Sequence, residues 1–143
     1  MTAINIHKER IKEHVQEIED AILIGIEKRP STIGLHTSAC SISLLELYLY
    51  KLGKIQIGTI IKHDWFKPPK PEQKIEPLAE RKLGVDFPNK NEILSLMYEI
   101  ENQRNKLIYG NPSEAVIKSV LESFQALHKL LKEKLKEVGE EIE

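Results

Sequence analysis

The chain has 143 residues, of which 41% are hydrophobic, and this predicts one domain over residues 1–143 with a single core. The formal net charge is −1, so no global positive field attracts nucleic acid, and binding of that kind would need a local patch. The one cysteine, Cys40, excludes an internal disulfide. Because neither a signal peptide nor a bilayer-spanning apolar run is visible, we expect a cytoplasmic protein without membrane contact.

Residues 5–29 are expected to form the first helix, because isoleucines and a valine recur there at helical spacing. Arg29 precedes Pro30 and should end this helix, since the residue before proline avoids helical backbone. His7 and His14 lie on one face but lack the His-Glu-x-x-His spacing of a zinc pair, so we interpret both as solvated.

The second helix is expected over 33–52, capped by Ser31 or Thr32. It is apolar nearly all round, which predicts the central and most buried helix of the fold. We interpret Cys40 as a small buried group and not as a nucleophile, since no activating neighbour is apparent. His36, in the first turn, is expected to be a hydrogen-bonded histidine at the rim of the bundle.

The segment 54–75 is expected to be a long irregular loop with one helical turn over Thr59–His63 and an extended proline-rich stretch over Lys67–Pro71. The loop combines basic and aromatic side chains, namely Lys62, His63, Trp65, Phe66, Lys67, Lys70 and Lys74. Such a mixture can contact a phosphate backbone and stack a base. We favour the alternative in which the two aromatic rings pack the loop onto the bundle and the lysines stay solvated.

Residues 89–110 are expected to form the helix that carries the candidate site. Asn89 should cap it with Glu92 at the capping-box spacing, and Gly110 should end it. The apolar residues at helical spacing are Ile93, Leu96, Met97, Ile100, Leu107 and Ile108. Arg104 falls at the edge of this apolar face, where a guanidinium needs a partner because burying an unpaired charge is costly.

A second line of side chains on this helix is polar and aromatic. It consists of Tyr98, Asn102, Asn105 and Tyr109, which share one face because of their spacing. A face that mixes Tyr, Asn and a neighbouring Arg is typical of a binding or dimer surface. The alternative is that Arg104 pairs with Glu99 or Glu101 while the tyrosine rings simply pack.

The rest of the chain completes a helical pattern. A short helix is expected over Glu76–Leu83, and the last helix should run from Pro112 to about Val138, with Asn111 as its cap. No stretch alternates strongly enough to predict a sheet. The fold class is therefore all-α, an up-and-down antiparallel bundle of four to five helices with one long loop rich in Pro and Lys.

Two segments carry a resemblance to a known family. They are Arg104–Gly110, with the sequence RNKLIYG, and Leu35–Gly53, with the sequence LHTSACSISLLELYLYKLG. Together with the helix order they resemble the HEPN family of small helical-bundle domains. In that family an arginine, usually followed by a polar residue, precedes a histidine by four to six further residues near the end of a long helix. The resemblance implies a metal-independent endoribonuclease site that two protomers build together. Many members are toxins or partners of a minimal nucleotidyltransferase, and others bind nucleotides or RNA.

The chain departs from the family motif at its last position, where Tyr109 replaces the histidine. Histidine titrates near neutrality, whereas the reference pKa of tyrosine is about 10, so tyrosine mainly donates hydrogen bonds at neutral pH. The resemblance implies that Arg104 clamps a phosphate. Beside it we expect Asn105 and Tyr109 to donate hydrogen bonds, and Glu101, one turn before Arg104, to orient the guanidinium. Arg104 and Tyr109 are about 140° apart around one helix, so a shared pocket requires helix distortion, a broad pocket or a second protomer.

We therefore expect a HEPN-like homodimer that binds a nucleotide or RNA around Arg104 and has lost cleavage or cleaves weakly. The expected catalytic residues are Arg104 and Tyr109, and the expected binding residues are Asn105, Asn102, Glu101 and Tyr98, with neither a metal nor a cofactor. One alternative is a non-enzymatic module that binds another protein, such as a nucleotidyltransferase or a toxin. Another is a ribonuclease that uses His36 or His63, brought to the site by folding.

Overall fold

The computed structural model describes residues 3–67 and 77–142. Five α-helices and two 3₁₀ turns follow one another in the order α1 (Ala3–Ile24), η1 (Ile26–Lys28), α2 (Pro30–Lys51), η2 (His63–Phe66), α3 (Leu78–Leu83), α4 (Lys90–Tyr109) and α5 (Glu114–Glu137). No strand occurs in these residues, so the predicted all-α helical bundle is confirmed.

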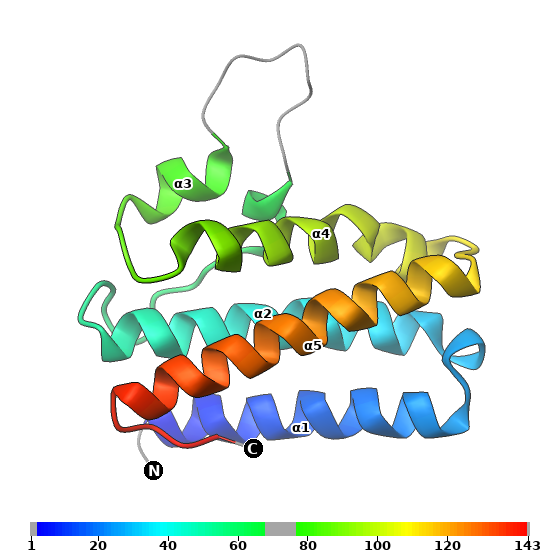
Figure 1. Cartoon of the computed structure of the whole chain (residues 1–143), viewed down its shortest axis with the longest axis horizontal. Coiled ribbons are helices and arrows are strands. Elements are labelled where there is room, and N and C mark those ends of the chain that lie inside the picture. The colour runs from blue at the N-terminus through cyan, green and yellow to red at the C-terminus, as the bar shows by residue number, and fades with distance from the viewer. Residues whose placement is uncertain (1–2, 68–76, 143) are drawn as a thin grey trace.

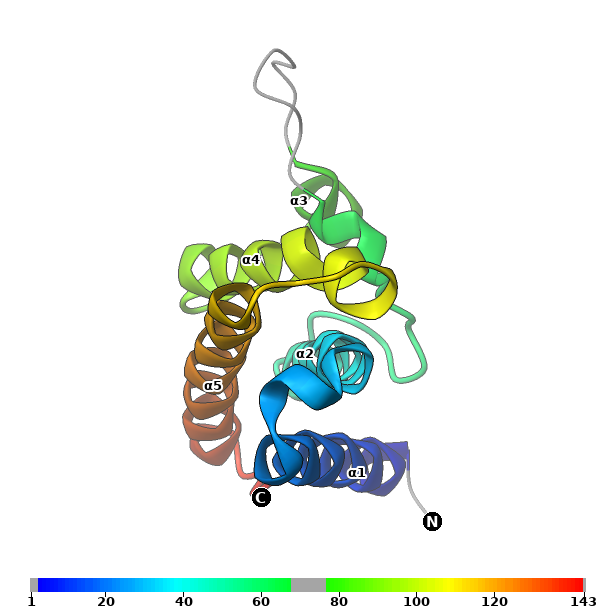
Figure 2. The same ribbon diagram turned by 90° about the vertical axis from the view of Figure 1, so that its right-hand side faces the viewer.

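Helix α2 lies at the centre of the bundle, where it contacts α1, α4 and α5. Figure 2 shows α1 below it, α4 above it and α5 along one side. In Figure 1 each long helix runs opposite to the long helix before it in the chain. Half of the residues of α2 are buried, which confirms the prediction from its apolar sequence that it is the central helix.

The segment that joins α2 to η2 is anchored onto this core. Phe66 is buried, and Trp65 packs against the core, as expected from the interpretation that the rings attach the loop. Glu46 of α2 also accepts a hydrogen bond from the Ile61 backbone N–H at 2.8 Å. The lysines 70 and 74 and most of the expected proline-rich stretch lie outside the described residues. The predicted helical turn over Thr59–His63 is displaced to His63–Phe66.

Several predicted helix boundaries are wrong because local capping signals compete. Helix α1 ends at Ile24 instead of Arg29, since Gly25 has a φ of 128° that only glycine adopts readily. Helix α2 then begins with Pro30 in its first turn, a position where the missing proline N–H is not needed. Ser31 therefore does not cap α2, and its hydroxyl instead donates to the Ile108 carbonyl at 2.7 Å.

The expected caps of the last two long helices also differ. Asn89 precedes α4 with a φ of 60°, and its amide donates to the Glu92 carboxylate at 3.1 Å instead of capping the backbone. At α5 the cap is Ser113, whose hydroxyl accepts from the Val116 N–H at 3.3 Å, and not Asn111. The central parts of the helices thus agree with the hydrophobic periodicity of the sequence, while the helix ends depend on which of several possible side chains caps the backbone.

The close packing of α2 against the end of α4 depends on Gly34. A Cβ atom at this position would lie 2.7 Å from the Leu107 Cβ, 3.1 Å from the Ile108 Cγ1 and 3.4 Å from the Arg104 carbonyl oxygen. The 2.7 Å contact is too short for two carbon atoms, and because the Leu107 Cβ is fixed to the backbone, the two helices would have to move apart. The absence of a side chain at Gly34 therefore sets the position of the part of α4 that carries Arg104.

We expect Gly34→Ala to lower the melting temperature by about 2–8 °C, although alanine is the better helix former by about 1 kcal/mol. The reason is overpacking, which we expect in the upper part of its usual range of about 1–3 kcal/mol, because the 2.7 Å contact is with the Leu107 Cβ, which side-chain rotation does not move. Thermal unfolding followed by circular dichroism measures the change, and Ser119→Ala on the exposed face of α5 is the control. A melting temperature equal to or above that of the wild type would contradict this role.

Candidate functional site

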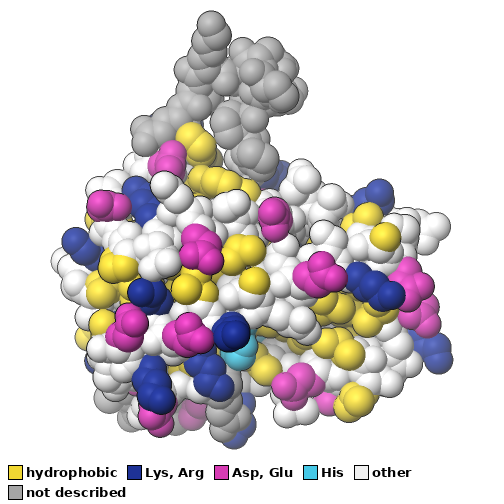
Figure 3. Space-filling view, in the orientation of Figure 1, with side chains coloured by type: hydrophobic (Ala, Val, Ile, Leu, Met, Phe, Trp, Pro, Cys, Tyr) yellow, Lys and Arg dark blue, Asp and Glu magenta, His cyan; other side chains and the backbone are white. Residues whose placement is uncertain are grey.

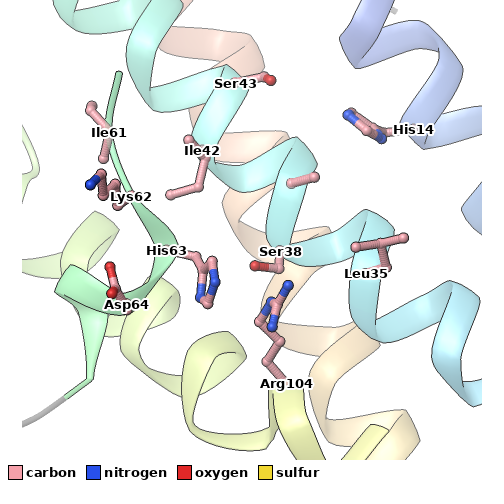
Figure 4. A pocket seen from close by; sticks show the side chains of 11 residues that line it. His14, Leu35, Ser38, Ile42, Ser43, Ile61, Lys62, His63, Asp64 and Arg104 are labelled. Atoms are coloured by element: carbon pink, nitrogen blue, oxygen red, sulfur yellow. The ribbon is translucent and has the colours of Figure 1, made fainter. Parts of the chain in front are cut away.

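A cleft of about 360 Å³ opens between α1, α2, the chain around η2 and the end of α4. Its lining is His14 from α1, Leu35, Ser38, Ala39, Ile42 and Ser43 from α2, Ile61, Lys62, His63 and Asp64 from the η2 region, and Arg104 from α4. Figure 4 shows these side chains around the opening. In Figure 2 the chain between α2 and η2 lies on the opposite side of α2 from α5, and α5 contributes nothing to this lining.

The Arg104 guanidinium points into this cleft beside Ser38 (Figure 4). Within the described residues its one hydrogen bond goes to the Asn105 side-chain oxygen at 3.3 Å, and its buried Nε has no partner. The expected pairing with Glu99 is not formed, because that carboxylate accepts from the Ser123 hydroxyl at 2.7 Å. A buried donor without an acceptor is unfavourable, so this side chain is suited to bind an anion that enters the cleft.

Glu101 does not orient Arg104, which corrects a prediction from the sequence. Its carboxylate oxygens lie 2.8 and 3.2 Å from the Nδ1 of His63. The carboxylate is only 4% exposed, whereas the imidazole is 40% exposed. An ionised carboxylate can only accept hydrogen bonds, so Nδ1 donates and the ring is held in one orientation. No described residue forms a hydrogen bond with the other ring nitrogen, Nε2, of this cleft-lining histidine.

The polar and aromatic face predicted on α4 does not form part of the cleft. Tyr109 is 79% exposed at the end of the helix, and Asn102 is also exposed. Tyr98 is partly buried and its ring lies 6.1 Å from the ring of Phe66. Asn105 reaches the site only through its hydrogen bond with Arg104. Within one chain, the cleft therefore contains Arg104 but not Tyr109.

From the sequence alone, His63 is one of two alternative histidines, and its pairing with Glu101 is not predicted. One signal was present: Glu101 lies four residues after Met97, on the apolar stripe of α4. A carboxylate in that position needs a partner from another element, because an isolated buried charge is costly. The chain offers 21 Lys and Arg side chains and five His side chains as partners, and only folding selects His63.

A pair of histidines lies on the α1 side of the cleft. The Nδ1 atoms of His14 and His36 are 2.9 Å apart, so one ring donates and the other accepts. The expectation of a hydrogen-bonded His36 is confirmed, but that of a solvated His14 is wrong. Burial, followed by the charge of His36, lowers the pKa of His14 below its ordinary value.

The lowered pKa of His14 predicts loss of stability in mild acid. Near the ordinary histidine pKa of about 6.5, the unfolded chain binds a proton that folded His14 resists, so the free energy of unfolding falls as the pH decreases. We expect a lower melting temperature at about pH 5.5 than at about pH 7.5. His7, whose pKa burial also lowers, acts in the same direction. The pH dependence of the melting temperature should therefore be weaker in His14→Gln than in the wild type, but it should not vanish. Equal pH dependence in the wild type and in His14→Gln would contradict the role of His14.

Cys40 is enclosed by the core and cannot serve as a nucleophile in this cleft. Burial raises the pKa of its thiol to about 12, so the reactive thiolate is scarce at neutral pH. Its sulfur lies 4.0 Å from the Ile11 carbonyl oxygen, between α1 and α2. The prediction of a small buried group is confirmed.

No family model, curated protein or solved structure matches the chain. The resemblance to HEPN domains therefore stays a prediction. Over the described ranges, 3–67 and 77–142, no group of three or more His, Cys, Asp or Glu side chains is arranged to hold a metal ion. In the same part of the chain, no helix is both long and apolar enough to cross a membrane.

Proposed function

We propose that this protein is HEPN-like and binds RNA or a nucleotide in the cleft, with Arg104 holding a phosphate group. One observation carries the proposal: a guanidinium faces the cleft, and no carboxylate among the described residues pairs with it. Arginine matches phosphate geometry with several parallel N–H donors, which makes phosphate the most suitable anion for this position.

The remaining lining supports a nucleotide-like ligand. Lys62 adds a second cation, while Leu35, Ile42 and Ile61 supply apolar surface for a ribose or a base. A volume of about 360 Å³ is within the usual range for small-ligand sites. Asp64 also lines the cleft, but in Figure 4 it lies on the opposite side of His63 from Arg104. The phosphate position at Arg104 is thus separated from this carboxylate by the imidazole.

Local charge has to provide the attraction, because the chain as a whole carries a formal charge of −1. On the face seen in Figure 3, Lys and Arg side chains alternate with Asp and Glu, without a continuous basic surface. The cleft lies on the side of α2 away from α5, the helix in front in this view. The face in Figure 3 therefore offers no continuous basic surface to a long duplex, and in the cleft the attraction comes from Arg104 and Lys62.

Arg104→Ala should weaken binding of a fluorescent oligoribonucleotide by about ten-fold or more. Hydrogen bonds to a charged group typically contribute about 1.5–3 kcal/mol, and the substitution removes them together with the charge. Fluorescence anisotropy at low ionic strength measures the Kd, and the dependence of Kd on salt should decrease because one phosphate contact is lost.

Arg10→Ala is the matched control for charge. Arg10 is exposed on α1, pairs with Glu13 at 3.3 Å and does not line the cleft. We expect its Kd to stay close to that of the wild type. Equal losses in the two variants would show that only net charge matters. If the wild type binds neither RNA nor nucleotides, the proposal is wrong and the protein-interaction alternative takes its place.

We also propose that the protein is a homodimer with Tyr109 in the contact, because the aromatic ring of this residue is exposed in the single chain. The C-terminal ends of α1 and α4 lie at the same end of the bundle (Figure 1), and the exposed Leu23 and Ile24 belong to the first of them. Exposed apolar and aromatic side chains of this kind are typical of protein interfaces.

Light scattering at micromolar concentration is expected to give twice the mass of one chain. Tyr109→Asp should shift the protein toward the monomer, because it places a charge in the contact, while the melting temperature of the monomer changes little at this exposed position. Lys118→Asp on α5 is the control for an added carboxylate elsewhere on the surface. A monomeric wild type would contradict the dimer but not the binding cleft.

A further inference from the structure

The pairing of Glu101 with His63 has the arrangement that general acid–base chemistry requires. The carboxylate is almost completely buried, while the imidazole that it holds is partly exposed at the cleft. In catalytic sites that use histidine, a third group orients the ring through one nitrogen so that the other can exchange a proton with the substrate. Here Nδ1 is the oriented nitrogen, and Nε2 has no hydrogen-bond partner in the described part of the chain.

The phosphate-binding position and the imidazole are set side by side by one helix. Glu101 and Arg104 are one turn apart on α4, so the carboxylate that fixes His63 and the guanidinium share the same backbone support. In Figure 4 the imidazole and the guanidinium both reach the region of Ser38. A phosphate held by Arg104 would therefore lie beside the imidazole.

The segment that brings His63 to this position is itself fixed at three points. The Ile61 backbone N–H donates to the Glu46 carboxylate, the His63 ring donates to the Glu101 carboxylate, and the Phe66 side chain is buried in the core. The three contacts reach α2, α4 and the interior. Such anchoring is what a preorganised catalytic group needs, because a base must be held in place before the reaction.

The surroundings of the imidazole indicate which nucleophile it could activate. Ser38 and Ser43 carry the hydroxyl groups of the cleft lining, and neither is hydrogen-bonded to His63 among the described residues. The buried Cys40 is not part of the lining. A ligand that brings its own hydroxyl next to a phosphate would meet the base directly, and RNA does so through its 2′-hydroxyl.

We infer that the cleft cleaves RNA, with His63 as the general base and Glu101 as the residue that positions it. The inference rests on the proposed function, because Arg104 has to hold the phosphate. It also differs from the arrangement that the HEPN resemblance implies, since the histidine comes from η2 of the same chain. Arginine and histidine are then both present within one protomer, and Tyr109 is not needed for proton transfer.

The reaction is a transfer of the phosphodiester within the RNA. Nε2 of His63 takes the proton of the 2′-hydroxyl, and the 2′-oxygen forms a bond to phosphorus. The bond between phosphorus and the 5′-oxygen breaks, the 5′-oxygen leaves with the electron pair and takes a proton from water, and the resulting hydroxide removes the proton from the imidazolium. The products are a 2′,3′-cyclic phosphate and a 5′-hydroxyl end. Arg104 stabilises the charge that develops on the non-bridging oxygens.

The test measures cleavage and binding on the same labelled oligoribonucleotide in the presence of EDTA. We expect the wild type to cut and to leave cyclic phosphate ends, and a substrate with a 2′-deoxy residue at the cut position to stay intact. His63→Ala should cut at least about 100-fold more slowly, which is the usual contribution of a general base. Its Kd for RNA should change by less than about three-fold, since Arg104 remains, and added imidazole should restore part of the rate.

Two further variants separate catalysis from folding. His63→Gln keeps a side-chain donor toward Glu101 and should remain folded, but it should cut as slowly as His63→Ala. Glu101→Gln should lower the cleavage rate at saturating RNA with an unchanged Kd. Because this loss appears in the rate and not in the Kd or the melting temperature, a purely structural role of Glu101 would not produce it. His7→Gln, outside the cleft, is the control and should cut normally.

Several results would overturn the inference while leaving the proposed function intact. These are RNA binding by the wild type without cleavage in EDTA, unchanged cleavage in folded His63→Gln, and cleavage of the 2′-deoxy substrate. Loss of cleavage in Tyr109→Phe with full activity in His63→Gln would also overturn it, and would assign proton transfer to Tyr109. Failure of the wild type to bind RNA would instead overturn the proposed function, and the inference with it.

Discussion

The hydrogen bond between the buried Glu101 carboxylate and the His63 imidazole is the interaction on which the cleft depends. A carboxylate on the apolar face of α4 would be strongly unfavourable without a partner. The partner comes from η2, 38 positions away in the chain, so the pair fastens the irregular segment between α2 and α3 to α4. That segment forms one wall of the cleft, and α4 contributes Arg104 to the other.

Close packing around α2 holds in place the two elements that carry Glu101 and His63. Gly34 lets α2 lie against the backbone of α4 near Arg104, and the Ser31 hydroxyl binds the Ile108 carbonyl near the end of the same helix. Glu46, also on α2, holds Ile61 on the other side of the cleft. Burial raises the pKa of Glu46, and the hydrogen bond from Ile61 counteracts part of that effect. The central helix therefore positions both walls of the site.

The proposed activity follows from the separation of charges in the cleft. Each carboxylate close to Arg104 on α4 is already engaged: Glu99 with Ser123 and Glu101 with His63. The guanidinium is left available to an external anion, and the imidazole keeps one nitrogen available for proton transfer. In the HEPN family the histidine of the motif would stand where Tyr109 stands, and in this chain that side chain is exposed and outside the cleft. In this chain the arginine and the histidine of the cleft come from two different segments, α4 and η2.

The amino-acid sequence by itself determined the helical bundle, the central place of α2 and the buried state of Cys40, because these depend on hydrophobic periodicity within continuous segments. It also placed Arg104 at the edge of an apolar face. Periodicity could not determine the helix ends, where Gly25, Pro30 and Ser113 prevailed over neighbouring capping residues. Nor could it determine which partners Glu101, His14 and Arg104 would have. Only the tertiary structure decided these, since a polar pairing between distant segments depends on how the helices pack and on which buried groups still lack a hydrogen bond.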